Sequence, residues 1–402
     1  MLLEQIDKEY EAMKAMLIEL AEINSYSYNL VGLDKVRARM KQAFLELEKN
    51  TPGLKLLIEE LELEDELSID SKAREVKNKL AKCLSIKKLS AKPGARKILL
   101  MGHMDTVFPE DSGFDKCVEI SEKGMNGPGV SDLKGGLVVM LKALEAFEKN
   151  PEAENIEWQV FLNSDEEIGS PGSQKFFSEL AEANELGLIY EPSLSDGSVA
   201  YRRKGTGNYQ LVVRGKSAHV GREFDKGASA ILSSAEFITK ANKLNSENII
   251  INFGKIQGGG PLNVVPDLAI TGINVRIENN EDGVLVEKGF DNLVYELNLK
   301  EGIEAKLYGK INRKPKIPNQ KLDELFTLVE SAAKELGQEI SRKNTGGCCD
   351  GNNLYESGLV NIDTLGVRGG KIHSHDEFVC LDSLTERAKL SCLVLQKLAV
   401  IK

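Results

Sequence analysis

The sequence predicts an α/β protein: a mixed, largely parallel sheet sandwiched by helices and interrupted by a small inserted α+β domain. Between residues 97 and 200, continuous apolar runs alternate with segments of helical period, which is typical of a sheet covered on both faces. Between residues 201 and 311, the order is strand, helix, strand, strand, helix, strand, the split ferredoxin-like unit. With 402 residues, the chain also exceeds the size that one hydrophobic core usually supports.

The expected elements follow in order along the chain. The first layer contains strands at 97–101, 158–163 and 186–190 and helices at 134–150 and 173–184. The inserted unit contains strands at 207–215, 248–259, 268–277 and 304–310 and helices at 227–244 and 286–298. After a Pro- and Lys-rich linker at 310–320, we expect a helix at 322–337, a strand at 359–367 and a closing helix from 383. These elements predict domain segments 1–200, 201–311 and 312–402.

Composition restricts the expected partners and compartment. Segment 1–24 has the spacing of an amphipathic helix, and its interspersed charges argue against a signal peptide or a membrane span, so we expect a cytoplasmic protein. The net charge of −10 is not accompanied by a concentrated basic patch, so we expect neither nucleic acid nor a membrane as partner. The six cysteines form no C-x-x-C pair, and we expect reduced thiols.

The first candidate site residue, His103, directly follows the apolar run at 97–101, in GHMDTV. A lone histidine after a strand is more often a satisfied core residue than a metal ligand. Asp105, however, lies two residues further on and on the same side of an extended chain. Its carboxylate can accept the imidazole N–H there, as the partners of metal-bound histidines do.

Further carboxylates and histidines occur at other expected strand ends and turns. Asp132 lies in the glycine-rich turn GPGVSDLKGG, where a helix-capping role is an equally good explanation. Asp165, Glu166 and Glu167 follow the strand at 158–163; they could form a solvated acidic turn, but adjacent carboxylates repel one another unless they share a cation. The remaining candidates are Glu191, in YEPS, and His373 and His375, in GGKIHSHDEF. Together they form the mixed N/O donor set of zinc and similar metals.

The order of these motifs resembles that of the co-catalytic zinc hydrolases, which include glutamate carboxypeptidase, acetylornithine deacetylase, succinyl-diaminopimelate desuccinylase and the aminoacylases. The resemblance spans residues 20–385 and rests on GHMDTV, GPGVSDLKGG, SDEEIGS, YEPS, GKSAHVGREFDKGASA, NVVPDLAITGINVR, GGCCDGNN and GGKIHSHDEFV. It implies a zinc-exopeptidase-like catalytic domain with two Zn2+ per chain, Co2+ or Mn2+ being substitutes. It also implies a homodimer formed through the inserted domain.

The resemblance implies five metal ligands in two groups. His103 and Glu191 would bind one zinc ion, and His373 and Glu167 would bind the other. Asp132 would bridge the two ions.

Two further residues of the same motifs would serve catalysis. Glu166 would act as the general base, and Asp105 would orient His103. The chemistry agrees, because two zinc ions lower the pKa of a bridging water while an unligated carboxylate takes its proton. In an extended chain, Glu166 and Glu167 would point in opposite directions, so that one ligates while the other stays free.

Three residues of the inserted domain receive roles from the same resemblance. His219, in GKSAHVG, would come from the partner subunit and stabilise the oxyanion of the tetrahedral intermediate; a surface-loop histidine is the alternative. Asn263 and Arg276 match positions that bind the substrate carboxylate, a task that suits a planar guanidinium.

Two features depart from the family pattern. Cys348 and Cys349 stand in GGCCDGNN where relatives have smaller residues, and would either narrow the pocket or bind inhibitory metal. His375 occupies a position often held by proline and is either an outer group of the site or unrelated to it. His373 fits the HSxDEF register and is the expected ligand.

The favoured function is therefore a di-zinc hydrolase of small peptides or N-acyl amino acids that cleaves an amide next to a free carboxylate. We expect a carboxypeptidase of the glutamate-releasing type, or alternatively an N-acyl amino acid deacylase of the acetylornithine deacetylase or desuccinylase type. An inactive dimeric binding protein is a remote alternative, because buried acidic clusters are costly without function. A thiol redox protein built on Cys348 and Cys349 would lack the usual C-x-x-C spacing.

Overall fold

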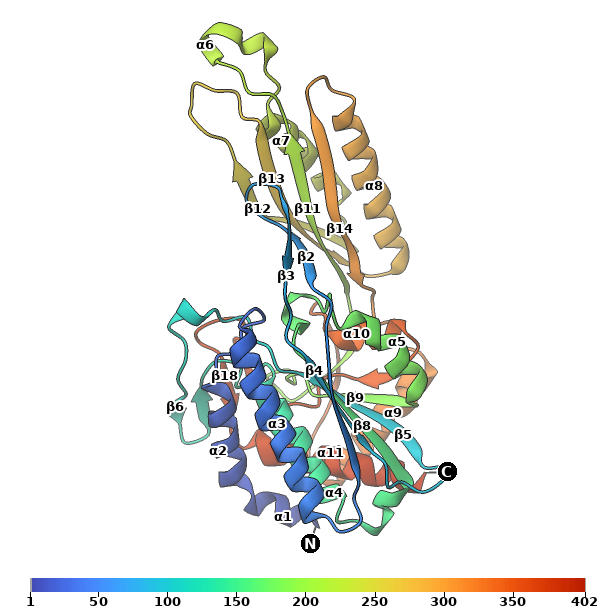
Figure 1. Ribbon diagram of the computed structural model, residues 1–402. Helices are drawn as coiled ribbons and strands as arrows, with labels where there is room; N and C mark the ends of the chain where they lie inside the picture. Colours follow the sequence, from blue (N-terminus) through green and yellow to red (C-terminus); the bar gives the residue numbers. More distant parts are fainter. Residues whose placement is uncertain (1, 402) are drawn as a thin grey trace.

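The computed structural model describes residues 2–401. Met1 and Lys402, at the outer ends of the predicted segments 1–200 and 312–402, lie outside the described residues. Figure 1 shows two parts: an α/β domain that contains both ends of the chain, and an elongated inserted domain that rises from it.

The α/β domain is built on a six-stranded sheet with the order β1-β4-β8-β5-β9-β16. Its strands are β1 (Leu56–Leu61), β4 (Cys83–Lys88), β5 (Arg96–His103), β8 (Ile156–Asn163), β9 (Leu186–Ile189) and β16 (Asn361–Ile362). In sheet order, the strands from β8 to β16 run parallel, and β4 and β1 complete the sheet in antiparallel order. Strands β5 and β8 are buried along almost their whole length, which explains their continuous apolar sequences.

Helices cover both faces of this sheet. One hydrophobic core includes residues of α1 (Leu2–Lys8), α2 (Tyr10–Ala21), α3 (Leu30–Asn50), α4 (Lys134–Phe147), α9 (Gln320–Glu335) and α11 (Ser383–Val400). A second core includes residues of α5 (Gln174–Ala183) and α10 (Asp350–Glu356). Successive residues of β5 divide between the two cores, since Leu100 belongs to the first and Met101 to the second.

Smaller elements complete the α/β domain. A four-stranded sheet has the order β17 (Gly369–Gly370), β18 (Phe378–Cys380), β7 (Gly124–Asn126) and β6 (Val118–Ser121). A two-stranded parallel sheet joins β10 (Val199–Arg203) to β15 (Arg342–Thr345). Short 3-10 helices lie at Glu110–Ser112 (η1), Pro151–Asn155 (η2), Glu166–Ile168 (η3), Phe224–Lys226 (η4) and Asn242–Leu244 (η5).

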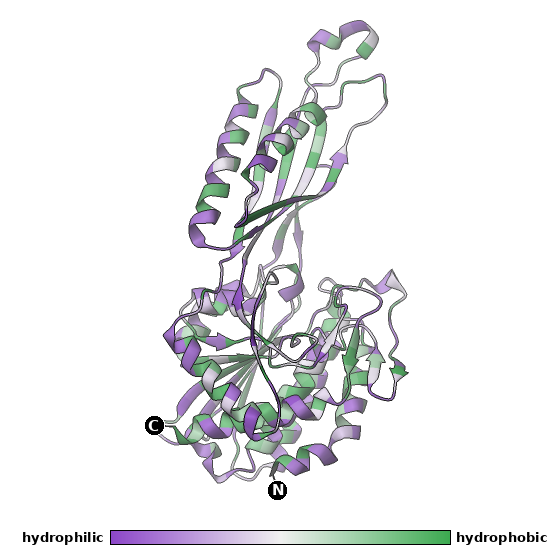
Figure 2. Ribbon diagram, turned by 180° about the vertical axis from the view of Figure 1, so that it is seen from behind, coloured by the Kyte–Doolittle hydropathy of each residue, from purple (hydrophilic) through white to green (hydrophobic). Residues whose placement is uncertain are grey.

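The inserted domain has the predicted β-α-β-β-α-β order. Its elements are β11 (Gly205–Arg214), α7 (Ala230–Ala241), β12 (Ile249–Gly258), β13 (Leu268–Ile277), α8 (Asn280–Asn298) and β14 (Glu304–Arg313), with the short α6 (Val220–Glu223) before α7. The strands form an antiparallel sheet with the order β12-β13-β11-β14, and residues of α7 and α8 share one core with its inner face. Hydrophobic residues recur along these strands, while the helices mix hydrophobic and hydrophilic residues, as one-sided burial requires (Figure 2).

A hairpin of the α/β domain reaches the inserted domain. It consists of β2 (Glu66–Ile69) and β3 (Glu75–Asn78), which lie between β1 and β4 in the sequence. Figure 1 shows it extending upward beside the inserted sheet. This hairpin, α3 and the strands β1 and β4 were not among the predicted elements.

The predicted linker at 310–320 is wrong in its first part. Strand β14 continues to Arg313, and both Arg313 and Lys316 are buried. Lys316 Nζ lies 2.8 Å from Asp363 Oδ2, so a lysine that would be expected on the surface is paired inside the protein. The backbones of Arg203 and Lys316 pair with each other, which holds together the two chain segments that connect the domains.

Two other predicted elements differ in extent. The predicted helix at 1–24 is two helices, α1 and α2, and the predicted strand at 359–367 is only Asn361–Ile362 with an isolated bridge between Tyr190 and Thr364. Within residues 2–401, no helix is both long and apolar enough to cross a membrane. All six cysteines are free thiols.

Candidate metal centre

Three of the five predicted metal ligands lie where parallel strands of the central sheet end. His103 is the last residue of β5, Glu167 lies in η3 after β8, and Glu191 follows β9. Asp132 lies in the loop before α4, and His373 lies in the loop between β17 and β18. The carboxyl ends of parallel strands meet at one sheet edge, so residues far apart in the sequence come together there.

The first group consists of His103, Asp132 and Glu191. His103 Nε2 lies 3.2 Å from Asp132 Oδ1 and 3.9 Å from Glu191 Oε2. All three side chains are buried, and one ligand atom from each lies within 4.8 Å of the others. One imidazole and two carboxylates at this spacing fit a single divalent cation.

The second group consists of Asp132, Glu167 and His373. His373 Nε2 lies 3.3 Å from Asp132 Oδ2 and 3.1 Å from Glu167 Oε2. Asp132 therefore presents one oxygen to each histidine, as a carboxylate that bridges two cations must. The donor atoms of this chain thus fit a pair of metal ions that share Asp132.

Glu377 supports the loop that carries Asp132. Its carboxylate accepts hydrogen bonds from the backbone N–H groups of Gly129, Ser131 and Asp132, at 3.2, 2.9 and 3.0 Å. Sequence reasoning assigned no role to Glu377, although it lies in the quoted motif GGKIHSHDEF. A buried carboxylate that binds three amides fixes the position of the shared ligand.

Asp105 connects the first histidine to the turn after β8. His103 Nδ1 lies 3.0 Å from the backbone oxygen of Asp105 and 3.3 Å from its Oδ1. The Asp105 carboxylate also accepts the backbone N–H groups of Glu166 and Glu167, at 3.2 and 3.1 Å, and the hydroxyl of Ser27 at 2.7 Å. One carboxylate thereby orients the imidazole and positions both glutamates.

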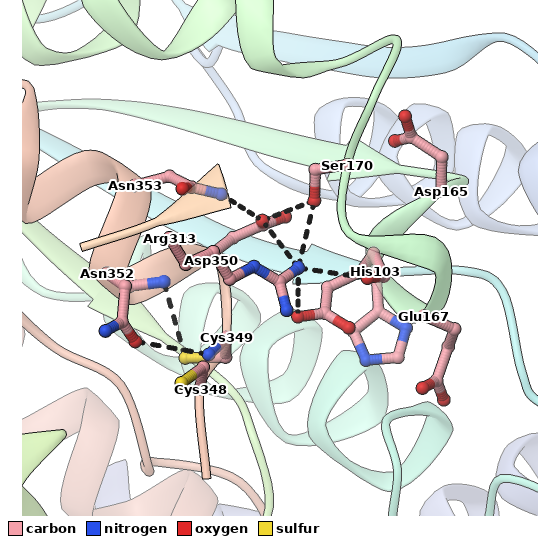
Figure 3. Close-up of polar contacts among 12 residues, drawn as sticks. His103, Asp165, Glu167, Ser170, Arg313, Cys348, Cys349, Asp350, Asn352 and Asn353 are labelled. Atoms are coloured by element: carbon pink, nitrogen blue, oxygen red, sulfur yellow. Dashed lines mark hydrogen bonds and ion pairs between the residues drawn. The ribbon is translucent and has the colours of Figure 1, made fainter. Parts of the chain in front are cut away.

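Glu166 and Glu167 are not extended, as was expected, but lie in the 3-10 turn η3. Their side chains still diverge, because Glu167 approaches His373 whereas Glu166 Oε1 lies 2.8 Å from the guanidinium of Arg313. Arg313 also contacts Ser170 and Asp350, each at 3.2 Å (Figure 3). Sequence reasoning missed Arg313 because its position in a Pro- and Lys-rich stretch indicated an exposed linker.

Burial and neighbouring charges perturb the pKa of every ligand. Burial and the Asp132 carboxylate raise the pKa of Glu167 to about 8, and burial raises that of Glu191 well above its usual range. Hydrogen bonds to Asp132 and Glu167 raise the pKa of His373 to about 11. Burial raises the pKa of Asp132, but hydrogen bonds from His103 and His373 outweigh it and hold the pKa well below its usual range. The carboxylates outnumber the imidazoles, so bound cations would relieve their repulsion.

The metal centre opens into a cavity of about 510 Å³. It is lined by Asp132, Glu166, Glu167, Glu191 and His373, and also by Arg203, Arg276, Arg313, Cys348 and Cys349. Arg203 and Arg313 have carboxylate partners, whereas Arg276, on β13, has none among residues 2–401.

Arg276 is held by neutral groups. Its Nε donates to Asn274 Oδ1 at 3.1 Å, and a terminal nitrogen lies 3.2 Å from Cys348 Sγ. Cys348 therefore faces the cavity beside a cationic group, while Cys349 is buried and its sulfur accepts the N–H of Gly351. Both cysteines therefore line the pocket and pack against its neighbouring groups.

Three predicted or considered residues lie away from the metal ligands. His219 immediately precedes α6, at the far end of the inserted domain in Figure 1, and the backbone of Asn263 accepts the N–H of Val220 beside it at 2.9 Å. Neither His219 nor Asn263 lines the cavity of its own chain. The ring of His375 stacks on Phe114 at 5.2 Å and joins neither metal group.

Known proteins share both the sequence pattern and the fold. The family model described as peptidase family M20/M25/M40 matches residues 99–397. Carboxypeptidase G2 of Pseudomonas sp. is 26% identical over 314 residues, 77% of this chain and 75% of that protein. Succinyl-diaminopimelate desuccinylase of Psychrobacter arcticus is 27% identical over 289 residues, 67% of this chain and 69% of that protein.

A solved structure extends the comparison to the whole fold. The M20 family metallo-carboxypeptidase Sso-CP2 from Sulfolobus solfataricus superposes with a TM-score of 0.74 at 16% identity, covering 97% of this chain and 99% of that chain. The superposition covers both the α/β domain and the inserted domain. Because the family match spans well over half of the sequence, this chain belongs to peptidase family M20/M25/M40 and is a hydrolase of peptide or acyl amide bonds.

Proposed function

We propose that the chain is a di-zinc carboxypeptidase of the glutamate-releasing type, which cleaves an amide bond next to a free carboxylate. The observation that carries this proposal is the content of one cavity: two metal-ligand groups that share Asp132, an unligated carboxylate at Glu166, and Arg276, which has no carboxylate partner among residues 2–401. The similarity to carboxypeptidase G2 supports it.

Five residues would hold the metals: His103 and Glu191 one ion, His373 and Glu167 the other, and Asp132 both. When bound, the ions would polarise the scissile carbonyl and acidify the attacking water. Asp105 orients His103 for this task through its contacts with Nδ1.

Glu166 is the proposed general base. Burial raises the pKa of its carboxyl to about 7, although the guanidinium of Arg313 opposes this shift. Such a pKa suits a group that takes the proton of the attacking water and then gives it to the leaving nitrogen. In this exchange one C–N bond breaks, one C–O bond forms, and Glu166 returns to its starting state.

Arg276 is the proposed carboxylate-binding group. It projects from the inserted sheet into the same cavity as Glu166, and the groups that hold it are neutral. A substrate carboxylate would therefore meet an uncompensated guanidinium, which binds it in a planar, two-point geometry.

We further propose that His219 and Asn263 act on the active site of a partner chain in a homodimer formed through the inserted domain. Both lie at the far end of that domain and outside the cavity of their own chain. In a two-fold dimer, each chain would supply these residues to the other, and His219 would stabilise the oxyanion of the tetrahedral intermediate.

An N-acyl amino acid deacylase is the second candidate. The desuccinylase of Psychrobacter arcticus resembles this chain as closely as carboxypeptidase G2 does in identity, at 27% against 26%. Both reactions need the same base and the same carboxylate-binding group, so they differ in the acyl part of the substrate and in the amino acid that is released.

A release assay with zinc-loaded protein tests the proposal. The panel contains N-acyl glutamates, N-acetylornithine, N-succinyl-diaminopimelate and dipeptides, and kcat/KM is measured for each. Preference for peptidyl or aroyl glutamates supports the carboxypeptidase, and preference for either deacylase substrate supports the second candidate. Hydrolysis of none of them by protein that contains two metal ions would contradict both.

A further inference from the structure

Cys348 contacts Arg276 across the boundary between the two domains. Arg276 lies on β13 of the inserted sheet, whereas Cys348 lies between β15 and α10 of the α/β domain. Arg276 Nη1 lies 3.2 Å from Cys348 Sγ, and both side chains line the cavity of the metal centre. The metal ligands and Glu166 also belong to the α/β domain. The contact therefore joins the proposed carboxylate-binding group to the domain that carries the metal centre.

The thiol of Cys348 is anchored where the inserted domain is attached. It donates a hydrogen bond to the backbone oxygen of Lys204 at 2.9 Å, so its sulfur faces Arg276 as an acceptor. Asn352, in the turn that follows Cys348 (Figure 3), donates to the same oxygen at 3.0 Å and to the backbone oxygen of Lys314 at 2.7 Å. Lys204 precedes β11 and Lys314 follows β14, so both segments that connect the domains are held by this turn.

The guanidinium of Arg276 is held at two of its three nitrogens. Nε donates to Asn274 Oδ1 at 3.1 Å, and Nη1 lies near Cys348 Sγ and 3.5 Å from the backbone oxygen of Gly346. The amide nitrogen of Asn274 donates to Asn208 Oδ1 at 2.7 Å, so its oxygen is the atom that faces Arg276. Nη2 has no hydrogen bond or ion pair among residues 2–401 and is available to a ligand.

Cys348 holds Arg276 without cancelling its charge. Burial raises the pKa of the Cys348 thiol, although the guanidinium of Arg276 opposes this shift, so the thiol stays protonated near neutral pH. A carboxylate at the same place would form a charged pair with Arg276 and compete with the carboxylate of the substrate. The chemical type of the residue at position 348 therefore matters as much as its size.

We infer that Cys348 is a positioning residue that fixes Arg276 relative to the metal centre, and that its neutral side chain preserves the preference for substrates with a free carboxylate. This inference rests on the proposed function, because Arg276 must be the group that binds the substrate carboxylate. A displaced guanidinium would still attract that carboxylate but would hold the scissile amide away from the metal centre.

The test compares two substrates: the compound preferred in the release assay, and its analogue in which a carboxamide replaces the main carboxylate. The readout is the ratio of kcat/KM for the carboxylate to kcat/KM for the carboxamide, measured with zinc-loaded protein. A merely structural role of Cys348 would lower both values equally and leave this ratio unchanged.

Two pairs of variants separate charge from positioning. Cys348→Asp should lower the ratio by about a hundredfold, mainly through KM, whereas the uncharged Cys348→Asn should lower it by about tenfold or less. Cys348→Ala removes the acceptor and should lower the ratio by about threefold to tenfold, and Cys348→Ser should restore it to within about twofold of wild type. Cys117→Ala is the matched control, because it removes a partly buried thiol outside this cavity.

A binding measurement adds a readout that does not depend on turnover. In a zinc-loaded Glu166→Gln background, calorimetric titration gives the affinity of both compounds. Adding Cys348→Asp should weaken binding of the carboxylate by about a hundredfold and leave that of the carboxamide unchanged. This measurement also decides the question if the wild-type enzyme does not cleave the carboxamide.

Four outcomes separate the inference from the function on which it rests. Unchanged ratios in all variants of Cys348, with the carboxylate substrate cleaved, would overturn the positioning role and leave the proposed function intact. Equal losses in Cys348→Asp and Cys348→Asn would also overturn the inference, because size and not charge would explain them. If Cys348→Asp fails to fold, failure of serine to restore the ratio lost in Cys348→Ala would overturn it. A wild-type enzyme that binds and cleaves both compounds equally would instead contradict Arg276 as the carboxylate-binding group, and with it the proposed function.

Discussion

The two halves of the metal centre use the same types of donor atom but differ in burial. The side chain of His103 is 1% exposed, whereas that of His373 is 51% exposed. His103 belongs to a central strand, while His373 lies in a loop with φ of 62°, a left-handed conformation that residues other than glycine adopt rarely. The first half is thus part of the folded core, and the second half is completed by a loop at the surface.

The supports of the two histidines differ in the same way. Asp105, itself buried, fixes His103 and the turn after β8 at once. The buried Glu377 holds one end of the loop of His373, but around His373 itself the contacts are at the surface, among them the hydrogen bond from Asn126 to the backbone oxygen of His375 at 3.0 Å and the stacking of His375 on Phe114. We therefore expect the two ions to bind with unequal strength, the ion of the His373 group being released first.

Asp132 belongs to both halves, and its replacement should have the largest effect. Asp132→Asn removes the charge that both groups share, so we expect loss of both ions and of all measurable activity. Metal analysis of the purified variant, beside wild type with about two ions per chain, measures this. Retention of one tightly bound ion would show that the two groups do not depend on a common ligand.

Glu166 and Glu167 separate catalysis from metal binding. Glu166→Gln should keep both ions and reduce kcat by about 10²- to 10⁴-fold, because a positioned general base is lost. Glu167→Gln should instead lose the ion of the His373 group. The opposite pattern of metal content would mean that the base and the ligand are interchanged.

Acidification should release both ions, because burial raises the pKa of a carboxylate ligand in each group, and the ion of the His373 group should leave first because His373 is the more exposed ligand. Burial and Asp132 raise the pKa of Glu167 to about 8, and metal binding requires its ionised form. Below this pKa the carboxyl is protonated in the metal-free protein, so the affinity of the His373 group should fall by about tenfold per pH unit for each proton displaced. Calorimetric zinc titrations at several pH values, with His373→Ala as the variant that lacks the weaker site, measure the effect. Equal affinities of both sites at every pH would contradict the expected inequality.

Subunit exchange tests whether His219 completes the site of the other chain. Glu166→Gln and His219→Ala proteins should each be nearly inactive. After mixing, half of the dimers are hybrids, and one site in each hybrid has both intact groups, so about a quarter of wild-type activity should return. Unchanged activity despite exchange shown by differently tagged subunits would return His219 to a role within its own chain.

Phe114 should have the smallest effect. Phe114→Leu removes the ring against which His375 stacks, a contact worth about 0.5–1.5 kcal/mol. The affinity of the His373 group should then fall by about twofold to tenfold, while the His103 group is unchanged. Competition with a chelator resolves the two ions in one experiment. A loss from the His103 group instead would show that Phe114 acts through general stability.

The sequence by itself determined the order of elements and the chemical type of the site. Continuous apolar runs identified β5 and β8, and the β-α-β-β-α-β order of the inserted domain is observed as predicted. Three of the five predicted ligands come together because they lie at or after the ends of parallel strands, whose common edge follows from topology alone, and Asp132 and His373 join them from loops. The sequence pattern alone is therefore sufficient to predict contacts between residues that the fold class itself brings together.

Only the tertiary structure decided which groups surround those ligands. Arg313 meets Glu166 across 147 residues, and Glu377 meets the amide of Asp132 across 245 residues. No local pattern distinguishes a buried, paired charge from a solvated one, so Arg313 and Lys316 were expected to lie on the surface. The contact between Cys348 and Arg276 is a similar case, because it exists only where a turn of one domain meets the sheet of the other. These features depend on side chains that meet through folding, and the energy of a buried charge depends on the partner that folding brings to it.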